Sequence, residues 1–166
     1  MRTALVAMVL AALAVISSFW QTAQNKESER MSPNPAVRFI KSETLAPSPG
    51  YSQAVEVRPG ARVIYIAGQV AMDHSGKLVG EGDLRAQTAQ TFENLKAALQ
   101  ASGASFENVV KLNSYFVDMT QLPVFREVRD KYVNTTNPPA STAVQVSRLF
   151  REGFLVEVEA VAVVPE

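Results

Sequence analysis

The chain has 166 residues, 47% of them hydrophobic, and its 16 basic residues balance its 16 acidic ones. This composition indicates one globular domain with a short appendage, and the lack of net charge or of a basic block excludes the pattern typical of nucleic-acid-binding proteins. Because the chain has no cysteine and one histidine, His74, disulfides and cysteine-based metal sites are excluded and no metal site is expected.

The N-terminus carries a targeting pattern. Arg2 precedes an apolar run over residues 4–16, and a positive residue before a short apolar segment is typical of a secretory signal. The run is shorter than the ~20 residues of a membrane span. We expect residues 1–23 to be a signal peptide of an exported or periplasmic protein. The alternatives are an uncleaved membrane anchor with Trp20 at the interface, and a cytoplasmic protein whose translation starts at Met31.

Residues 24–36 are polar and contain two prolines, so we expect a linker before a folded domain over residues 37–166. In that domain the period of the apolar residues switches between strand and helix spacing. The spacing predicts strands at residues 37–40, 54–57, 62–67, 109–117, 143–149 and 155–164, and helices at 83–102 and 121–133.

The first predicted helix has the stronger signals. Asp83 can cap its N-terminus and Gly103 follows its end. The residues expected on its buried face are Thr88, Phe92, Leu95 and Leu99, with Gln87 placed elsewhere on the helix.

The second predicted helix carries a run of charged residues among its apolar ones. Helical ion pairs explain Arg126 and Arg129, although an arginine that faces a cleft could instead bind a carboxylate with two hydrogen bonds. The residues expected to point inward are Leu122, Phe125, Val128 and Tyr132.

The order of these elements predicts an α+β fold, in which a mostly antiparallel six-stranded sheet carries two helices on one face. The strands are too apolar for the other face to remain in water. We therefore expect the chain to oligomerise through its sheet.

Several residues are candidates for chemistry. Glu157 and Glu159 alternate with apolar residues, so both lie on one face of the last strand. That face could be solvated, or it could hold a carboxylate whose pKa is raised by burial and which positions a water. Gly68 marks either a bulge or a close approach. Tyr51 lies in a loop that could line a pocket, and His74 lies in a predicted turn over residues 73–76.

Six short segments occur in an order and spacing typical of one protein family. They are Pro49-Gly50-Tyr51-Ser52-Gln53-Ala54, Ala67-Gly68-Gln69-Val70, Phe92-Glu93-Asn94-Leu95, Phe116-Val117-Asp118-Met119, Pro139-Ala140-Ser141 and Glu157-Val158-Glu159-Ala160-Val161-Ala162. Over residues 46–164 the chain thus resembles the Rid (YjgF/RidA, reactive intermediate deaminase) family.

The resemblance implies a chorismate-mutase-like (YjgF-like) fold and a homotrimer whose sheets pack into a central barrel. It implies ligand sites in the clefts between subunits. It also implies hydrolysis of enamine and imine metabolites released by pyridoxal-phosphate enzymes, without a metal or cofactor. The expected partners are a small metabolite and two further copies of the chain, no nucleic acid, and a membrane only through an uncleaved N-terminal segment.

The resemblance also implies roles for single residues. The glutamate that positions the attacking water matches Glu157, and the pocket tyrosine and glycine match Tyr51 and Gly68. The arginine that binds the substrate carboxylate in this family is replaced by Ser141. Arg126 stands where an asparagine is usual, and we count it with Ser141 among the substrate-binding positions.

Two functional hypotheses follow. The chain is a hydrolytic deaminase in which Arg126, or a different substrate, compensates for Ser141. Alternatively, it is a trimer that binds a small molecule without turnover because the arginine is lost.

Overall fold

The computed structural model describes residues 34–166. The predicted signal peptide or anchor over residues 1–23 and all but the end of the predicted linker lie outside the described residues. Within residues 34–166, no helix is both long and apolar enough to cross a membrane.

The elements follow one another largely as the sequence predicts. In chain order they are β1 (Val37–Ile40), β2 (Ala54–Val57), β3 (Ala61–Val70), α2 (Leu84–Ala101), the 3-10 turn η1 (Phe106–Asn108), β4 (Val109–Phe116), the 3-10 turn η2 (Met119–Gln121), α3 (Leu122–Arg129), β5 (Ala140–Gln145) and β6 (Val156–Pro165).

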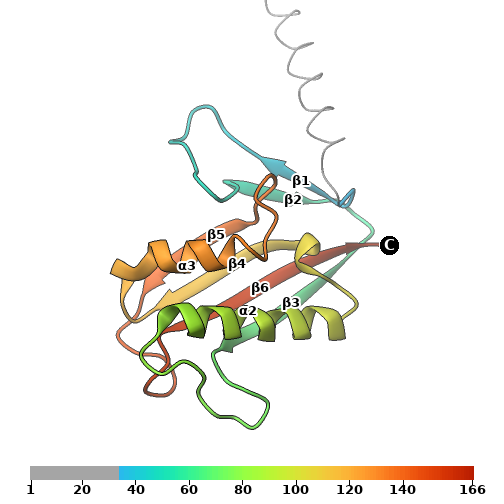
Figure 1. Cartoon of the computed structure of the whole chain (residues 1–166). Helices are drawn as coiled ribbons and strands as arrows, with labels where there is room; N and C mark the ends of the chain where they lie inside the picture. Colours follow the sequence, from blue (N-terminus) through green and yellow to red (C-terminus); the bar gives the residue numbers. More distant parts are fainter. Residues whose placement is uncertain (1–33) are drawn as a thin grey trace, which may run out of the picture. The chain divides into compact units, whose positions relative to one another are not determined.

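Four strands form the main sheet in the order β3-β6-β4-β5, and both helices lie on one face of it (Figure 1). Strand β6 is antiparallel to β3 and to β4, whereas β4 and β5 are parallel and α3 lies in the crossover between them. The α+β fold class with two helices on a mostly antiparallel sheet is therefore confirmed.

The expectation of a single six-stranded sheet needs a correction. Strands β1 and β2 pair only with each other, as a separate antiparallel ribbon. The turn before β3 explains the separation, because Pro59 offers no N–H for pairing and Gly60 takes a left-handed conformation with φ of 80°. The chain thus changes direction between β2 and β3.

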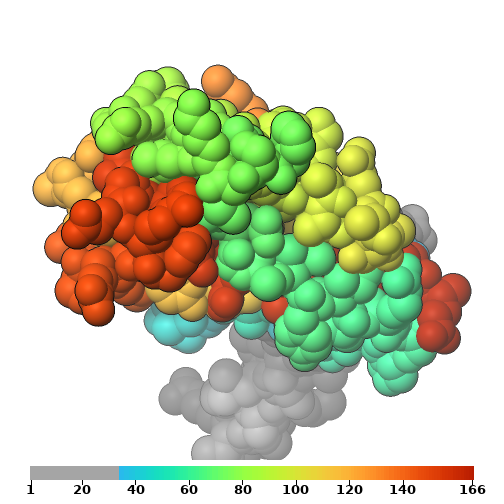
Figure 2. All heavy atoms as spheres, turned by 90° about the horizontal axis from the view of Figure 1, so that it is seen from below, coloured from blue at the N-terminus to red at the C-terminus, as the bar shows by residue number. Residues whose placement is uncertain are grey.

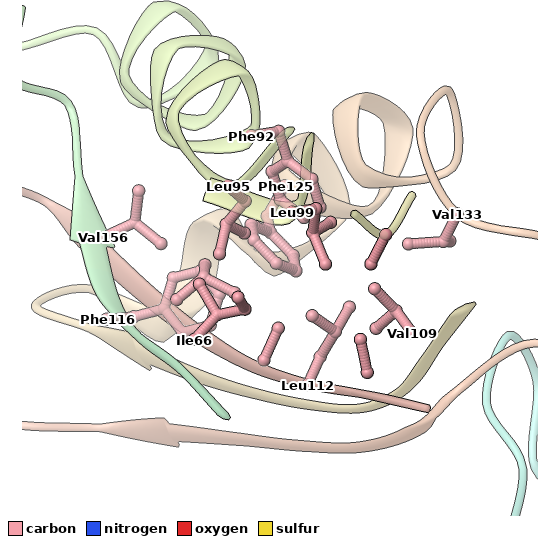
Figure 3. Close-up of a cluster of buried hydrophobic side chains, with 14 of the residues drawn as sticks. Ile66, Phe92, Leu95, Leu99, Val109, Leu112, Phe116, Phe125, Val133 and Val156 are labelled. Carbon is pink, nitrogen blue, oxygen red and sulfur yellow. The ribbon is translucent and has the colours of Figure 1, made fainter. Parts of the chain in front are cut away.

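The core lies between α2, α3 and the sheet. The predicted buried face of α2 is confirmed, because Thr88, Phe92, Leu95 and Leu99 are fully buried. In Figure 3 the side chains of Phe92, Leu95 and Leu99 point from the helix toward residues of the strands, and Phe125 of α3 lies beside them. Burial of side chains of this size contributes about 1.5–3 kcal/mol each, so this layer holds both helices on the sheet.

Several boundaries differ from the prediction, among them the end of α3 and the start of β5. Helix α3 ends at Arg129 with Asp130 as its C-cap, earlier than predicted. Strand β5 starts at Ala140, where the small residues of its first half pair with β4 from Lys111 onward. Residues 140–142 belong to the strand through backbone hydrogen bonds and not through apolar side chains. The prediction from the apolar pattern therefore starts this strand three residues too late.

Gln87 was placed outside the buried face of α2, and this prediction was wrong. The side chain is fully buried. Its amide nitrogen donates to the carbonyls of Gly80 and Gly153, and its oxygen accepts from the N–H of Leu155. It thereby ties α2 to the loop between β5 and β6. Figure 2 shows that loop, in orange-red, next to the green segment that follows β3, and Arg151 there donates to the carbonyl of Gly76.

Candidate functional site

A pocket of about 270 Å³ lies beside α3 and the start of β5, and we call it the α3 pocket. It brings together three of the predicted site residues, Tyr51, Arg126 and Ser141. Its full lining is Tyr51, Met119, Leu122, Phe125, Arg126, Arg129, Ser141 and Ala143.

Hydrogen bonds of a buried serine fix the loop that carries Tyr51. The N–H of Ser52 donates to the carbonyl of Pro139, and its hydroxyl donates to the carbonyl of Pro138 over 2.6 Å. These bonds join the loop to Pro138 and Pro139, which precede β5 and lie three and two residues before Ser141 in the sequence. Tyr51 and Ser141 therefore lie at the same pocket although they are far apart in the sequence.

Arg129 also lines the α3 pocket; the sequence analysis left open whether it forms a helical ion pair or faces a cleft, and did not count it among the site residues. It is 6% exposed, the one charged side chain buried to this degree in the part of the chain that the structure describes. Its Nε atom donates a hydrogen bond to Oδ1 of Asp130 over 2.8 Å, and its Nη2 atom lies 2.7 Å from the same oxygen in an ion pair. A Cβ atom at position 50 would lie 2.9 Å from Nη2, so Gly50 leaves room for the guanidinium.

A signal for this burial was present in the sequence. Arg129 follows Phe125 by four residues and Leu122 by seven, so it shares the face of α3 that carries these apolar residues. The helical ion pair expected for Arg126 does not form within residues 34–166.

Gly68 and Glu157 meet at a second location, on neighbouring strands. The pairing of β3 with β6 shifts register between Ile66 and Gln69, so Gly68 lies in a β-bulge. A Cβ atom on Gly68 would lie 2.1 Å from Oε1 of Glu157. The interpretation of Gly68 as a bulge is therefore confirmed, and the absence of a side chain there also leaves room for the carboxylate of Glu157.

The two glutamates of β6 have different surroundings. Glu159 accepts hydrogen bonds from Nδ2 of Asn113 over 2.7 Å and from the hydroxyl of Tyr115 over 3.2 Å. Glu157 is half-buried, and its carboxylate makes no hydrogen bond or ion pair with any residue of the described range 34–166. Burial, and secondarily the charge of Glu159, raises the pKa of Glu157 above its ordinary value. An unpaired carboxylate of this kind can hold a water and accept its proton.

Glu157 lines a separate pocket of about 330 Å³, which we call the β6 pocket. Its walls combine an arginine with aromatic and aliphatic side chains, namely Tyr115, Val146, Arg148, Leu149 and Phe150, together with Glu157 and Glu159. In a single chain, Tyr51, Arg126 and Ser141 thus line the α3 pocket and Glu157 lines the β6 pocket, while Gly68 lies beside Glu157 and lines neither.

His74 lies at the exposed tip of the predicted turn. Oδ1 of Asp73 builds this turn by accepting from the N–H groups of Ser75 and Lys77 and from the Ser75 hydroxyl. Residues 34–166 contain no group of three histidine or acidic side chains placed to hold a metal ion.

Comparisons with known proteins agree on one family. The sequence pattern of the endoribonuclease L-PSP family matches residues 41–164. A RutC family protein of Pyrococcus abyssi is 39% identical over 119 residues, which are 70% of this chain and 90% of that protein. The 2-iminobutanoate/2-iminopropanoate deaminase of Mus musculus is 39% identical over 129 residues, 76% of this chain and 92% of the mouse protein.

The solved structures give the same result. The crystal structure of YyfB from Yersinia pestis, a protein of the conserved Rid family, superposes with a TM-score of 0.71 at 37% identity. The matched part covers 76% of this chain and 98% of YyfB. The similarity therefore extends over nearly all of YyfB.

Proposed function

The chain belongs to the family of the endoribonuclease L-PSP, Rid and RutC proteins, and from this premise we propose that it is a cofactor-independent hydrolytic deaminase of small enamine or imine metabolites. Relatives from mouse, Dermatophagoides farinae and human carry the name 2-iminobutanoate/2-iminopropanoate deaminase, at 34–39% identity. We extend to this chain the reaction type that the name states, without fixing the substrate.

The observation that supports this proposal best is the state of Glu157. Glu157 is half-buried, has a raised pKa and lacks a protein partner. A carboxylate with a raised pKa is a better general base than an ordinary one, because a general base works best when its pKa lies near the pH of the reaction. Glu159 is occupied by Asn113 and Tyr115, so it is the weaker candidate.

In the proposed reaction, Glu157 holds a water next to the imine carbon and accepts a proton as the water oxygen forms a bond to that carbon. Glu157 passes this proton to the nitrogen, which gives the carbinolamine. The proton of the carbinolamine hydroxyl then also moves to the nitrogen, the carbon–nitrogen bond breaks, and ammonia leaves as the carbonyl forms. The sum is one imine and one water giving one carbonyl compound and one ammonia. No oxidant, metal or cofactor is required for this balance.

The α3 pocket would complete the site from a neighbouring copy. Within one chain Glu157 and Ser141 line different pockets. In a homotrimer of the kind that the resemblance implies, the β6 pocket of one subunit would adjoin the α3 pocket of the next. Tyr51 and Arg126 would then contact the substrate while Glu157 acts on it from across the interface.

The second candidate is binding without turnover, and Ser141 favours it. Serine has no charge to meet a substrate carboxylate, and the loss of a bidentate ion pair removes several kcal/mol of gross interaction from a partly desolvated site. We do not propose RNA cleavage despite the family's name, because the chain has no net charge.

Imine hydrolysis by the purified full-length protein tests the proposal. An amino-acid oxidase would generate 2-imino acids in the assay, and semicarbazide would trap the imine that survives. We expect the wild-type protein to reduce the trapped product, and Glu157→Gln to lower the hydrolysis rate at least about a hundredfold, because the amide cannot accept the proton.

Glu159→Gln is the matched control, since it lies on the same face of the same strand and its amide keeps partners within reach. It should retain most of the activity. Full activity in Glu157→Gln would exclude the role of Glu157, and inactive wild-type protein that still binds a metabolite would favour the second candidate.

A further inference from the structure

The aromatic ring of Phe150 has no role in the reaction as proposed. Phe150 lines the β6 pocket together with Glu157, and it is 69% exposed. Among the large hydrophobic residues of the described range 34–166, only Tyr65 is more exposed. An apolar ring that stands in water gains free energy when a ligand or a partner covers it. A contact for the free side of this ring is therefore expected.

The loop that carries Phe150 is fixed on both sides of this residue. Leu149 and Phe154 are buried and belong to one apolar cluster. The ring of Phe150 stacks on that of Phe154, with centroids 5.3 Å apart and planes 25° from parallel. The guanidinium of Arg151 lies 4.9 Å from the centre of the Phe154 ring and donates to the carbonyl of Gly76. These contacts hold the ring of Phe150 in place at the pocket, and a preorganised wall of this kind lowers the cost of binding.

A second aromatic ring, that of Tyr115, lines the same pocket. Tyr115 of β4 pairs with Glu157 of β6, so the two side chains lie side by side on one face of the sheet. The hydroxyl of Tyr115 donates to Glu159 over 3.2 Å, which fixes the position of the ring. Val146 and Leu149 add aliphatic surface. An apolar wall with two aromatic rings thus adjoins the carboxylate that we propose as the general base.

The charges of the β6 pocket disfavour a further anion. Its charged groups are Arg148, Glu157 and Glu159, so with both glutamates ionised the net charge is about one negative unit. An uncharged group with a flat apolar surface matches both the charge and the walls. The volume of about 330 Å³ lies within the range of small-molecule sites, about 300–1,000 Å³. The pocket therefore has room for a ring.

We propose that the β6 pocket holds an aromatic side chain of the substrate, with the substrate ring against Phe150 and Tyr115 and the imine carbon next to Glu157. The substrate class is an imine or enamine with an uncharged aromatic substituent, and Phe150 is a specificity-determining residue. The inference rests on the proposed function, because it names the substrate class of the site that contains Glu157. It departs from the short aliphatic compounds in the names of the mouse and human relatives.

A ratio of two hydrolysis rates tests the inference. In the trapping assay the oxidase makes 2-imino-3-phenylpropanoate from phenylalanine and 2-iminopropanoate from alanine. For the full-length wild type we expect kcat/KM to be at least about tenfold higher for the phenyl compound. Phe150→Ala should lower this ratio about tenfold through the phenyl compound, while kcat/KM for 2-iminopropanoate changes by less than about threefold.

Two further variants separate the ring from its bulk. Phe150→Tyr keeps the flat ring and should keep the ratio, whereas Phe150→Leu keeps an apolar side chain and should lose at least about threefold of it. Phe150→Leu also keeps the test valid if Phe150→Ala does not fold. Leu45→Ala is the matched control, because Leu45 is 60% exposed and lies outside the β6 pocket, and it should leave the ratio unchanged.

Sedimentation of each variant tests the other use of an exposed ring, which is contact with a neighbouring copy of the chain. An unchanged ratio in Phe150→Leu would overturn the inference. A loss of assembly in Phe150→Ala that lowers the rates for both imines equally would overturn it as well, because the ring would then serve the interface and not the choice of substrate.

Binding of phenylacetamide separates the inference from the proposed function, because its planar amide is not an imine and is not turned over. NMR titration of the full-length protein should give a Kd at least about tenfold lower for phenylacetamide than for acetamide, and Phe150→Ala should remove most of this difference. Binding that depends on Phe150, without imine hydrolysis, would leave the aromatic site standing and remove the deaminase. Imine hydrolysis with a ratio that does not respond to Phe150 would leave the deaminase and overturn the inference.

Discussion

The carboxylate of Glu157 is held where its charge is unfavourable. Burial raises its pKa first, and the charge of Glu159 adds to the effect. The native state therefore retains the proton at pH values at which the unfolded chain, with a glutamate pKa of about 4.3, has released it. The contribution of this proton to stability is complete below the unfolded pKa and is lost as the pH rises through the raised native pKa.

Glu157→Gln removes this titration and should change the pH dependence of stability. As the pH rises from about 4 to 7, the wild type should lose free energy of unfolding relative to Glu157→Gln, because only the wild type must ionise a poorly solvated carboxylate. Urea unfolding at a series of pH values measures the difference. A constant difference across the series would show that Glu157 has the same pKa in the folded and unfolded chain.

Some site residues could be predicted from the sequence, and others depend on contacts that it does not encode locally. The alternation of the last strand placed Glu157 and Glu159 on one face, but their different surroundings come from Asn113 and Tyr115 on β4. Arg129 was not counted among the site residues because its charge suggested a solvated helix face, while its burial depends on the absence of a side chain at Gly50.

At the scale of single elements, α2 shows that local signals predict boundaries well. Asp83 accepts hydrogen bonds from the N–H groups of Arg85 and Ala86, as expected of an N-cap, and the helix ends just before Gly103. The start of β5 could not be found in this way, because Ala140 and Ser141 are in a strand only through their pairing with β4. Non-local pairing overrides local propensity there.

Helix α2 also holds the loop between β5 and β6, and Gln87 carries this connection. Gln87→Ala should lower the free energy of unfolding by about 1–3 kcal/mol, because it removes a fully buried side chain and leaves the half-buried N–H of Leu155 and the carbonyl of Gly153 without this partner. Gln100→Ala, an exposed position on the same helix, should change it by less than about 0.5 kcal/mol.

Chemical denaturation of the two variants measures these effects. The loop carries Phe150, which lines the β6 pocket with Glu157. We therefore expect Gln87→Ala to impair imine hydrolysis under conditions in which the protein is still folded. Equal stability of the two variants would mean that water replaces the lost hydrogen bonds.

For the whole molecule, the part of the sheet around Tyr65, on the face opposite the helices, is what a single chain leaves uncovered, whereas β1 covers Val110 and Val163 on that face. Tyr65 of β3 is 81% exposed, and it pairs across the strands with Val161, which in turn pairs with Lys111. These residues line a hollow of about 320 Å³ on the sheet. A tyrosine this exposed on an apolar strand is typical of a contact surface.

The homotrimer that the sequence resemblance implies remains a prediction, and Tyr65 tests it. We expect the full-length protein to sediment at three times the mass of one chain, and Tyr65→Asp to weaken assembly at least about a hundredfold, because it buries a charge in an apolar interface. Ala97→Asp, exposed on α2 on the other side of the sheet, is the matched control and should leave the trimer intact.

If Glu157 acts on a substrate held by the α3 pocket of a neighbouring copy, Tyr65→Asp should also lose imine hydrolysis although it keeps Glu157, Arg126 and Arg129. A monomeric variant with full activity would place the whole site within one chain, and a monomeric wild type would exclude the trimer itself.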